Sequence, residues 1–340
     1  MTGEAVRDPA VPINVVAALN EALAYALEVD PTVLVFGEDV VDNPHGGVFG
    51  VTNGLSTRFG DRVRSTPISE QAILGAGIGA ALAGMRPVAE IMLMNFMTVG
   101  MDMLTNHAAK LRYMSGGQTA VPLTVRMATG AGKGFGAQHS EMLESWLTHI
   151  PGLKVVVPSN AADAKGLLTS CIFDDDPCVF IEQHHLYFSS KGEVPTGRYT
   201  VPLGKAAIAR SGSDVTVITY GRQVGDALAA ATSLGAEGID VEVLDLRSLT
   251  PLDTTAILES VAKTRRAVVA HEAVVRGGFG AEIAALINEE LFGQLDAPVA
   301  RVGAPFTPIP FAANLESLYL PGAAEIEAGI RTVAKTKESV

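Results

Sequence analysis

The sequence predicts an α/β protein built from two doubly wound units, each with a mostly parallel β-sheet between layers of helices. Short apolar runs alternate with longer helical segments, a pattern typical of buried parallel strands covered on both faces. The chain has 340 residues, which is long enough for two units with separate cores. Hydrophobic residues make up 48% and charged residues only 18%, which argues against a disordered chain.

The first half of the chain, residues 13–188, shows the clearest alternation. We expect helices at 14–28, 69–83, 98–113 and 161–173, with Ser69 as the N-cap of the second. Continuous apolar residues predict strands at 33–36, 87–92, 122–127, 154–157 and 179–182. The apolar stretch 73–104 is interrupted by charged residues and a proline, so we expect a core helix and a buried strand there. A membrane span would need about 20 uninterrupted apolar residues.

A segment rich in helix- and strand-breaking residues separates this half from a second α/β unit. We expect a linker at 189–204, because the residues around it include several prolines and glycines. The second unit is expected at 205–335. Its predicted strands are 215–219, 241–244, 267–270 and 299–302, and its predicted helices are 224–234, 254–262 and 281–291.

Charge and cysteine content limit the partners and the compartment. The formal net charge is −12 and the sequence has no basic stripe, which argues against binding to nucleic acid or to an anionic membrane. Residues 1–9 have no apolar core, so no export or organelle-targeting signal is expected there. Cys171 and Cys178 could form a disulfide by number alone, but two reduced, buried thiols are favoured. A cytoplasmic location is therefore expected.

Glycine-rich segments and adjacent histidines give only weak signals for a nucleotide or metal site. GAGIG at 75–79 lies inside an expected helix, and GAGKG at 130–134 lacks the spacing of a phosphate-binding loop. His184 and His185 are expected at the surface, because neighbours on an extended segment point in opposite directions. No group of residues in the sequence has the spacing of zinc ligands.

Two polar segments are more informative. Glu70 falls in the first turn of the expected helix 69–83, where an acidic side chain complements the helix dipole even without a further role. His139 follows the mobile-looking, glycine-rich residues 130–136. A histidine there can belong to an exposed loop, or it can be a proton donor that reaches a pocket.

Many short motifs occur in a fixed order along the chain. Those of the first half are GEDV (37–40), TPISE (66–70), GMRPV (84–88), NF (95–96), AKLRYMSGG (109–117), AQHS (137–140), PGLKVV (151–156) and DAKGLL (163–168). Those of the second half are DLR (245–247), TPLD (250–253) and residues 305–310. Together they resemble the β subunits of the pyruvate and acetoin dehydrogenase decarboxylase components, which are thiamine-diphosphate-dependent members of the transketolase-like family. The resemblance runs from about residue 13 to about residue 330 and implies a pyrimidine-binding domain followed by a transketolase C-terminal-type domain.

The resemblance implies a catalytic role for Glu70. This residue matches the glutamate that hydrogen-bonds the pyrimidine N1′ of thiamine diphosphate and so promotes loss of the thiazolium C2 proton. That chemistry needs a carboxyl group held in a largely apolar pocket, which Ile68, Ala72 and Ile73 could help to form. Ile68 is accordingly expected in the cofactor site.

Three other side chains and a backbone site also match the family. Phe96 matches the ring that stacks on the aminopyrimidine, Glu38 matches a second acid beside the cofactor, and His139 matches the histidine that assists acyl transfer to a lipoyl group. A monovalent cation such as K+ is implied as well, bound mainly through carbonyl groups. Its expected positions are Leu123, Cys171, Ile172, Asp174 and Asp176.

An absent motif supports assignment to a β subunit. Thiamine enzymes bind magnesium and the diphosphate through a Gly-Asp-Gly motif, but here Gly60 and Asp61 are followed by Arg62. The resemblance therefore implies a separate α subunit that holds Mg2+, with the cofactor at the α–β interface of an α2β2 heterotetramer. The small residues of 75–84 are a candidate for close subunit packing. A lipoyl-bearing acyltransferase is the expected acyl acceptor and would dock on the second domain.

The implied reaction is oxidative decarboxylation of a small 2-oxo acid with acyl transfer to lipoamide. Residues 46–52, 146–151 and 315–321 resemble the acetoin and bacterial pyruvate branch, although LMNFMT at 93–98 departs from acetoin-type sequences. Gln138 replaces the second histidine of many branched-chain enzymes. Pyruvate is narrowly favoured, followed by acetoin and then branched 2-oxo acids.

Two other functions remain as alternatives. A transketolase-like enzyme that works as a single chain is disfavoured because the Gly-Asp-Gly motif is missing. A non-catalytic assembly subunit is disfavoured because Glu70, Phe96 and His139 are all present.

Overall fold

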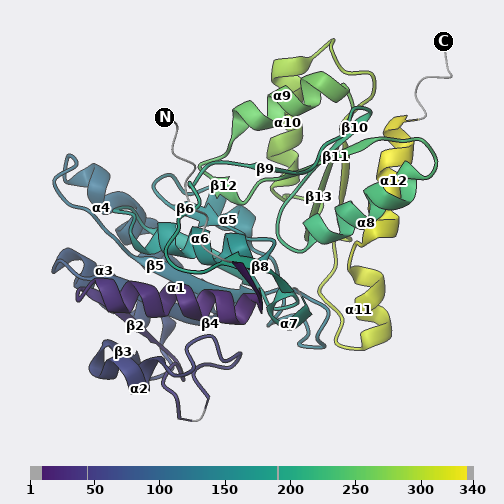
Figure 1. Ribbon diagram of the computed structural model, residues 1–340. Coiled ribbons are helices and arrows are strands. Elements are labelled where there is room, and N and C mark those ends of the chain that lie inside the picture. The colour runs from purple at the N-terminus through teal and green to yellow at the C-terminus, as the bar shows by residue number, and fades with distance from the viewer. Residues whose placement is uncertain (1–9, 44, 190, 335–340) are drawn as a thin grey trace, which may run out of the picture.

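A seven-stranded sheet forms the centre of the first half of the protein (Figure 1). The computed structural model describes residues 10–43, 45–189 and 191–334. All strands of this sheet are parallel except the edge strand β12, which runs antiparallel to β6. The order across the sheet is β12 (Ser248–Thr250), β6 (Lys154–Val156), β7 (Cys178–Gln183), β5 (Thr124–Thr129), β4 (Arg86–Leu93), β2 (Val33–Gly37) and β3 (Val63–Ser65).

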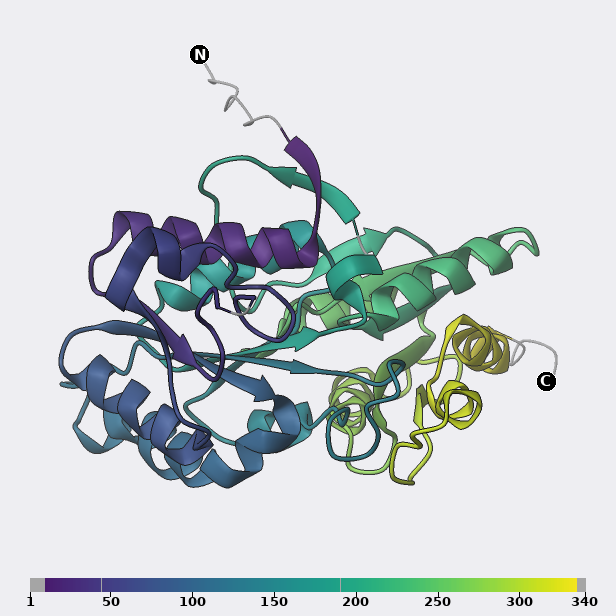
Figure 2. The same cartoon turned by 90° about the horizontal axis from the view of Figure 1, so that it is seen from below.

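Helices cover both faces of this sheet (Figure 2). On one face α1 (Val15–Val29) and α6 (Ala161–Ile172) share a buried apolar cluster. On the other face lie α3 (Glu70–Leu82) and a helical run made of η2 (Met94–Gly100), η3 (Met103–Ala108) and α4 (Ala109–Met114). Every residue of β5 and β7 is buried, as expected for central strands covered on both sides. Shorter helical elements are α2 (Leu55–Phe59), η1 (Gly60–Arg62) and α5 (Glu144–Thr148).

One local expectation for these helices needs correction, and another is confirmed in position only. The predicted single helix at 98–113 is a 3-10 turn, a π-helical turn and a short α-helix in succession. Within it the Thr105 hydroxyl donates to the Met101 carbonyl at 2.9 Å, which competes with regular backbone bonding. Ser69 is the N-cap residue of α3, but its side chain makes no capping hydrogen bond. Expectations of a core helix and buried strand in 73–104 are confirmed by α3 and β4.

The second sheet has five strands and its own helical layers. Its order is β14 (Ala300–Ala304), β13 (Ala267–Val274), β10 (Val215–Thr219), β11 (Val241–Asp245) and β9 (Ala207–Arg210), of which only β9 is antiparallel to its neighbour. On one face α8 (Gln223–Gly235) and α12 (Ala323–Ala334) share an apolar cluster. Helices α9 (Thr254–Thr264) and α10 (Gly280–Leu291) cover the other face, and α11 (Ala313–Tyr319) lies beside α12 in the fold (Figure 1).

Part of the expected linker has regular structure. Residues 191–195 form β8 (Lys191–Pro195), which pairs antiparallel with β1 (Ala10–Asn14) near the start of the chain. The helical turn α7 (Leu186–Ser189) precedes it. Prolines are tolerated in this ribbon because it has only two strands, each with one edge that needs no partner. Part of the segment between the two units is therefore hydrogen-bonded to strand β1.

The two units share a continuous apolar core. Strand β12 belongs to the second half of the chain but extends the first sheet, and the amide of Val157 donates to the Arg247 carbonyl at 2.8 Å. Nearby, the Tyr220 hydroxyl donates to Glu144 at 2.7 Å, and both residues are buried. These contacts hold the second unit firmly against the sheet that carries the candidate site.

Cys171 and Cys178 are free and buried, as predicted, and burial raises the pKa of Cys171 well above its usual value.

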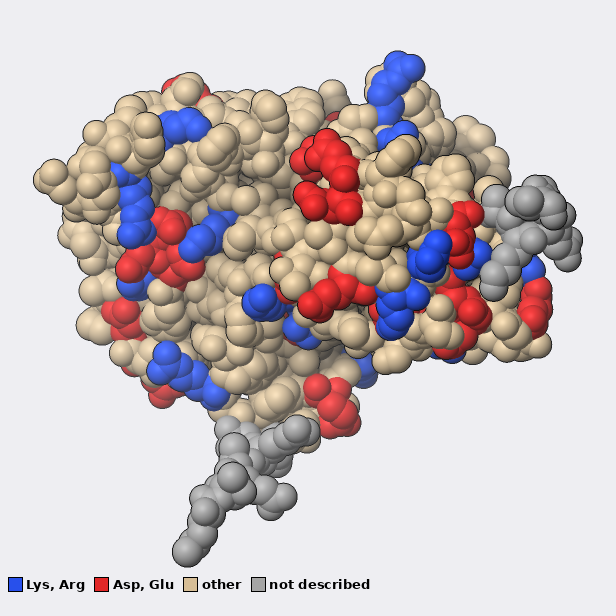
Figure 3. Space-filling model, turned by 90° about the horizontal axis from the view of Figure 1, so that it is seen from above, with Lys and Arg blue, Asp and Glu red and all other residues tan. Residues whose placement is uncertain are grey.

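On the face in Figure 3, basic and acidic side chains are interspersed. Among the described residues, no helix is both long and apolar enough to span a membrane. The expectation about residues 1–9 lies outside the described part of the chain.

Candidate active site

Four of the expected site residues follow the carboxyl ends of four strands that are neighbours in the first sheet. Glu38 follows β2, Glu70 follows β3, Phe96 follows β4 and His139 follows β5. Since these strands are parallel, their carboxyl ends lie at one edge of the sheet. Ligand sites of open α/β sheets form at that edge. The fold therefore collects residues that are up to a hundred positions apart in the sequence.

Glu38 is a buried carboxyl group with an unused oxygen. It lies in the turn after β2, its residue is 6% exposed, and its Oε1 atom has no hydrogen-bond partner among the described residues. Burial raises the pKa of Glu38, and the charges of Glu70, Asp39 and Glu90 raise it further. A buried acid of this kind can hold a proton and offer it to a bound group.

Glu70 lies in the first turn of α3, where it is half-buried. Of the three apolar residues expected to help form a pocket around Glu70, this chain alone covers one, and the pocket stays a prediction. Ile68 is 83% exposed and Ala72 is also exposed, whereas Ile73 is buried. Among the described residues, Pro67, Ile68 and Ser69 are likewise all exposed. The site is consequently open on the side where Ile68 lies.

Phe96 and His139 are in direct contact. Their ring centroids lie 5.2 Å apart with an interplanar angle of 79°, which is an edge-to-face arrangement. Asn95 holds the two segments together: its amide donates to Glu141 Oε2 at 2.6 Å, and its carbonyl oxygen accepts from the Glu141 amide at 3.2 Å. Both rings remain partly exposed, so they can still meet a bound molecule.

The two pairs of residues are linked through the helical run after β4. Gly100 approaches Glu70 so closely that an added Cβ would lie 3.3 Å from the Glu70 carbonyl oxygen. The turn that carries Phe96 thus packs directly on the start of α3. Together with the contact between Phe96 and His139, this packing brings the segments that carry Glu70, Phe96 and His139 side by side.

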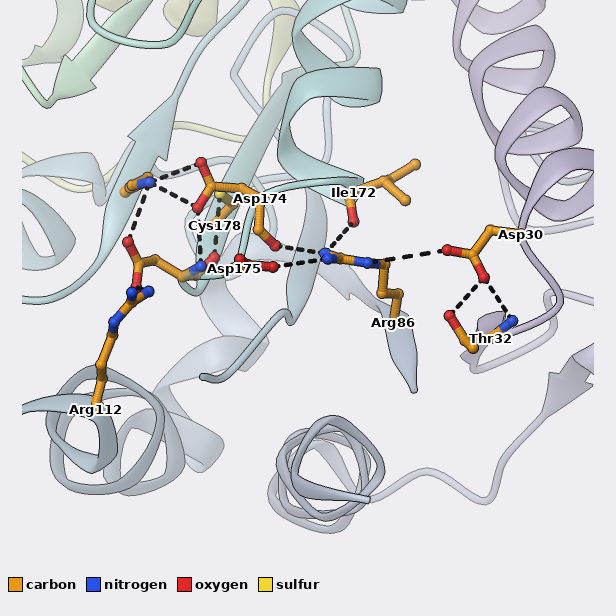
Figure 4. A network of polar contacts seen from close by, with 10 residues as sticks. Asp30, Thr32, Arg86, Arg112, Ile172, Asp174, Asp175 and Cys178 are labelled. Atoms are coloured by element: carbon orange, nitrogen blue, oxygen red, sulfur yellow. Dashed lines mark hydrogen bonds and ion pairs between the residues drawn. The ribbon is translucent and has the colours of Figure 1, made fainter. Parts of the chain in front are cut away.

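Positively charged side chains of this chain contact three of the five residues of the expected cation site, at the turn between α6 and β7. Figure 4 shows Arg86 beside Ile172 and Asp174. The guanidinium of Arg86 donates to the carbonyls of Ile172 at 3.4 Å and Asp174 at 2.9 Å. The Lys154 ammonium lies 2.6 Å from Asp174 Oδ1 and 3.3 Å from Asp176 Oδ2.

The two other carbonyls of the expected cation site also have donors. The carbonyl of Leu123 accepts from the Cys178 amide at 2.9 Å, and that of Cys171 accepts from the Asp174 amide at 3.2 Å. The described residues contain no group of three His, Cys, Asp or Glu side chains arranged to hold a metal ion. These oxygens thus each have a partner within this chain, and the monovalent cation stays a prediction of the resemblance.

Sequence reasoning missed a buried ionic cluster behind the site. Arg126, 2% exposed, donates to Glu182 at 2.6 and 2.8 Å and to Glu90 at 2.7 Å, while the Tyr187 hydroxyl donates to Glu182 at 2.6 Å. Burial raises the pKa of Glu90, and Arg126 opposes that rise. The sequence did offer a signal for this cluster, namely a charged residue inside each of three apolar strands. An unpaired charge is costly inside a buried sheet, so such residues are expected to pair.

The expected surface position of the adjacent histidines is wrong for His184. This residue is 3% exposed, and its ring lies 5.1 Å from that of Phe135 and 6.0 Å from that of Phe49. Burial lowers the pKa of His184 to about 4. Aromatic residues from two separate loops cover this histidine, and sequence spacing gives no sign of that packing.

The fold and the edge-of-sheet site are those of a transketolase-like protein, and comparison of the sequence agrees. Residues 11–189 match the family described as transketolase, pyrimidine binding domain, and residues 204–326 match transketolase, C-terminal domain. The chain belongs to this thiamine-diphosphate-dependent family, within the group of pyruvate and acetoin dehydrogenase β subunits.

Relatives cover nearly the whole chain. It is 47% identical over 331 residues to the acetoin:2,6-dichlorophenolindophenol oxidoreductase subunit beta of Cupriavidus necator, covering 95% of this chain and 98% of that protein. It is 46% identical over 310 residues to the pyruvate dehydrogenase E1 component subunit beta of Bacillus subtilis, covering 91% and 94%. A solved split-gene transketolase, described as an inactive beta4 tetramer, has the same fold, with a TM-score of 0.78 at 24% identity over 96% of this chain and 100% of that one.

Proposed function

We propose that this chain is the β half of a thiamine-diphosphate-dependent decarboxylase component. In this proposal Glu38, Glu70, Phe96 and His139 form the side of the site that receives the pyrimidine part of the cofactor. The observation that carries the proposal is their common position at the carboxyl ends of four adjacent strands. Ile68, at the exposed edge of this group, would contact the cofactor from the open side.

The residues present fit an aminopyrimidine ring. Such a ring has a flat face, ring nitrogens and an amino group; the site offers the Phe96 ring, the Glu70 carboxyl and the unpaired Oε1 of Glu38. When bound, thiamine diphosphate supplies the carbon centre that takes up the electrons of the broken bond. Glu70 would share a proton with a ring nitrogen, and Glu38, whose pKa is raised, would help to keep that proton in the site.

His139 is proposed to manage the proton of the acyl-accepting thiol. Its ring is held against Phe96 but is only half-buried, so it can reach a second substrate as well as the cofactor side. A neutral imidazole can accept the thiol proton while the acyl group is transferred. The proposed acceptor is the lipoyl group of an acyltransferase.

A separate α subunit is proposed to complete the site. Two observations support it: the open side of the site at Ile68 and Ala72, and the names of relatives that are themselves called β subunits. The α subunit would supply the Mg2+ and diphosphate ligands for which this sequence lacks a Gly-Asp-Gly motif. Closing the open side would also remove Glu70 from water and strengthen its interaction with the cofactor.

Pyruvate is the first substrate of the proposal and acetoin the second. Relatives of nearly equal identity carry the two names, 46% for the pyruvate enzyme and 47% for the acetoin enzyme. Both molecules present a small carbonyl carbon whose neighbouring bond is cleaved, so the same residues of this chain would serve either.

The test is reconstitution with the partner. The chain would be co-expressed with an α-type subunit and assayed for dye reduction with thiamine diphosphate and Mg2+, using pyruvate, acetoin and a branched 2-oxo acid in parallel. The chain alone is the control. Activity in the mixture only, with pyruvate preferred, is the expected result. A stable but inactive complex would favour the assembly-subunit alternative, and activity of the isolated chain would favour a transketolase-like enzyme.

A further inference from the structure

Two buried carboxylates from the second α/β unit bind the glycine-rich loop that leads to His139. The Ala131 amide donates to Glu272 Oε1 at 2.7 Å. The amides of Gly132 and Gly134 donate to the two oxygens of Glu316, at 2.8 and 2.9 Å. The glycine-rich loop, whose sequence suggested mobility, is therefore held by hydrogen bonds to the backbone amides of three of its residues.

The backbone conformation of the loop is what allows this binding. Gly132 has a φ of 102° and Gly134 a φ of 71°, values that side-chain-bearing residues rarely adopt. This geometry turns both amides toward one carboxylate. Alternate glycines here thus serve to bind a carboxylate of the same chain, rather than a phosphate.

Both carboxylates are buried, and that of Glu272 has a further hydrogen-bond donor outside the loop. Glu272, on β13, and Glu316, on α11, are each 3% exposed. The second oxygen of Glu272 accepts from the Gln183 side-chain amide at 2.8 Å, and the Gln183 carbonyl oxygen in turn accepts from the Arg222 backbone amide. Hydrogen bonds from amides to buried carboxylates are stronger than those between neutral groups.

His139 lies between this anchor and a second one. Its amide donates to the Gly136 carbonyl at 3.4 Å, at the end of the glycine-rich segment. On the other side, the Thr129 hydroxyl donates to the Glu141 carbonyl at 2.6 Å, and Asn95 binds Glu141 as described above. The position of the His139 ring therefore depends on both ends of the loop.

We propose that Glu272 and Glu316 are positioning residues for His139, which hold the loop 130–136 so that the His139 ring stays against Phe96. Neither carboxylate is placed near the reacting atoms. The role assigned to His139 rests on the proposed function, whereas the holding of the loop does not. The second unit would then help to shape a site that lies on the first sheet.

Limited proteolysis of the full-length chain tests the holding of the loop. Lys133 is exposed and lies between the two amides that Glu316 binds, so trypsin cleavage after Lys133 reports local opening. Glu316→Ala removes two charge-assisted hydrogen bonds and should speed this cleavage by about tenfold or more. The matched control is Glu325→Ala, because Glu325 also accepts from a glycine amide, that of Gly322 at 2.9 Å, but does not contact the loop.

A swap of two side chains provides a test that does not depend on a disruptive variant. Glu272→Gln keeps the shape but sets two side-chain amides against each other, so cleavage after Lys133 should rise. Adding Gln183→Glu restores every hydrogen bond with donor and acceptor exchanged between the two residues. Cleavage in the double variant should return to within about twofold of the original.

Activity of the reconstituted complex then tests the positioning role. Glu316→Ala, Glu272→Gln and His139→Ala should each lower lipoyl acylation more than dye reduction, and adding Gln183→Glu to Glu272→Gln should restore acylation in that variant. Unchanged cleavage in both Glu316→Ala and Glu272→Gln would overturn the proposal. Faster cleavage with normal acylation would also overturn it. If His139→Ala itself spared acylation, the proposed role of His139 would fail, while the protease result would still report separately on the loop.

Discussion

The ring of His139 packs edge-to-face on the ring of Phe96, although one follows β5 and the other follows β4. This pair links the residue proposed for cofactor stacking to the residue proposed for acyl transfer. A substitution of either ring should therefore alter the position of the other ring.

Truncation of the Phe96 ring should weaken cofactor binding. Phe96→Ala removes a partly exposed aromatic face and leaves the His139 ring without its neighbour. Stacking contributes about 1 kcal/mol beyond burial, so the Kd of the reconstituted complex for thiamine diphosphate should rise at least about fivefold. Titration of the cofactor by calorimetry measures this change.

Val99→Ala is the control for this variant. Val99 lies in the same helical turn as Phe96 and is 61% exposed, but it has no aromatic ring to stack on the cofactor. A Kd that rises equally in both variants would contradict the assignment of Phe96 to the cofactor site.

Loss of the Arg126 side chain should be strongly destabilising. Arg126→Met leaves two acids, Glu90 and Glu182, buried without their shared cation. Breaking a buried ion pair from one side costs about 3–5 kcal/mol in the free energy of unfolding. Urea denaturation of the full chain measures the loss, and replacing both glutamates by glutamine in the same variant should recover part of it.

A surface ion pair gives the comparison for this prediction. Arg58 pairs with Glu28 at 2.9 Å, but the two side chains are 51% and 60% exposed. Arg58→Met should therefore change the free energy of unfolding by at most about 1 kcal/mol. Equal effects of the two substitutions would show that the buried cluster does not stabilise the fold as described.

Acid should destabilise the second unit through His271. Burial lowers the pKa of this fully buried histidine to about 4, from an ordinary 6.5, although its Nδ1–H donates to the Ala273 carbonyl at 3.1 Å. Between pH 6.5 and pH 4 the unfolded state binds a proton that the folded state does not. The free energy of unfolding should thus fall by about 2 kcal/mol between pH 7 and pH 5 from this residue alone.

Replacement of His271 tests the assignment of this pH dependence. His271→Asn retains a donor for Ala273 but cannot titrate, so its stability should vary less over the same pH range. His149→Asn, at an exposed position after α5, is the control for loss of a histidine. An unaltered pH dependence in His271→Asn would assign the effect to other buried groups, such as His184.

The parts of the fold that the sequence predicts well are those set by local pattern. The apolar runs at 122–127 and 179–182 became β5 and β7, which are buried at every position. Strand β12 was not predicted, because residues 248–250 are short and pair with a strand about ninety positions earlier. The ribbon of β1 and β8 escaped prediction for the same reason, since its pairing spans most of the first half of the chain.

For the candidate site, the family resemblance identified the residues, and the structure shows how they are arranged in space. Glu38, Glu70, Phe96 and His139 could be named from motifs, but their gathering at one edge depends on strand order. Glu272 and Glu316 could not be found in this way. They lie far along the chain from the loop they bind, and an isolated acid in a sequence carries no sign of which amides it will meet.

The most direct test of the proposed role of Glu70 is the exchange rate of the cofactor's C2 proton in a complex that contains Glu70→Gln. This variant should assemble normally but exchange the proton at least about 100-fold more slowly, since a positioned acid or base contributes that much or more. Gln71→Ala, at an exposed position in the same turn of α3, should exchange at the original rate. An unchanged rate in Glu70→Gln, with the cofactor bound, would contradict the central claim that this chain carries the activating carboxyl group.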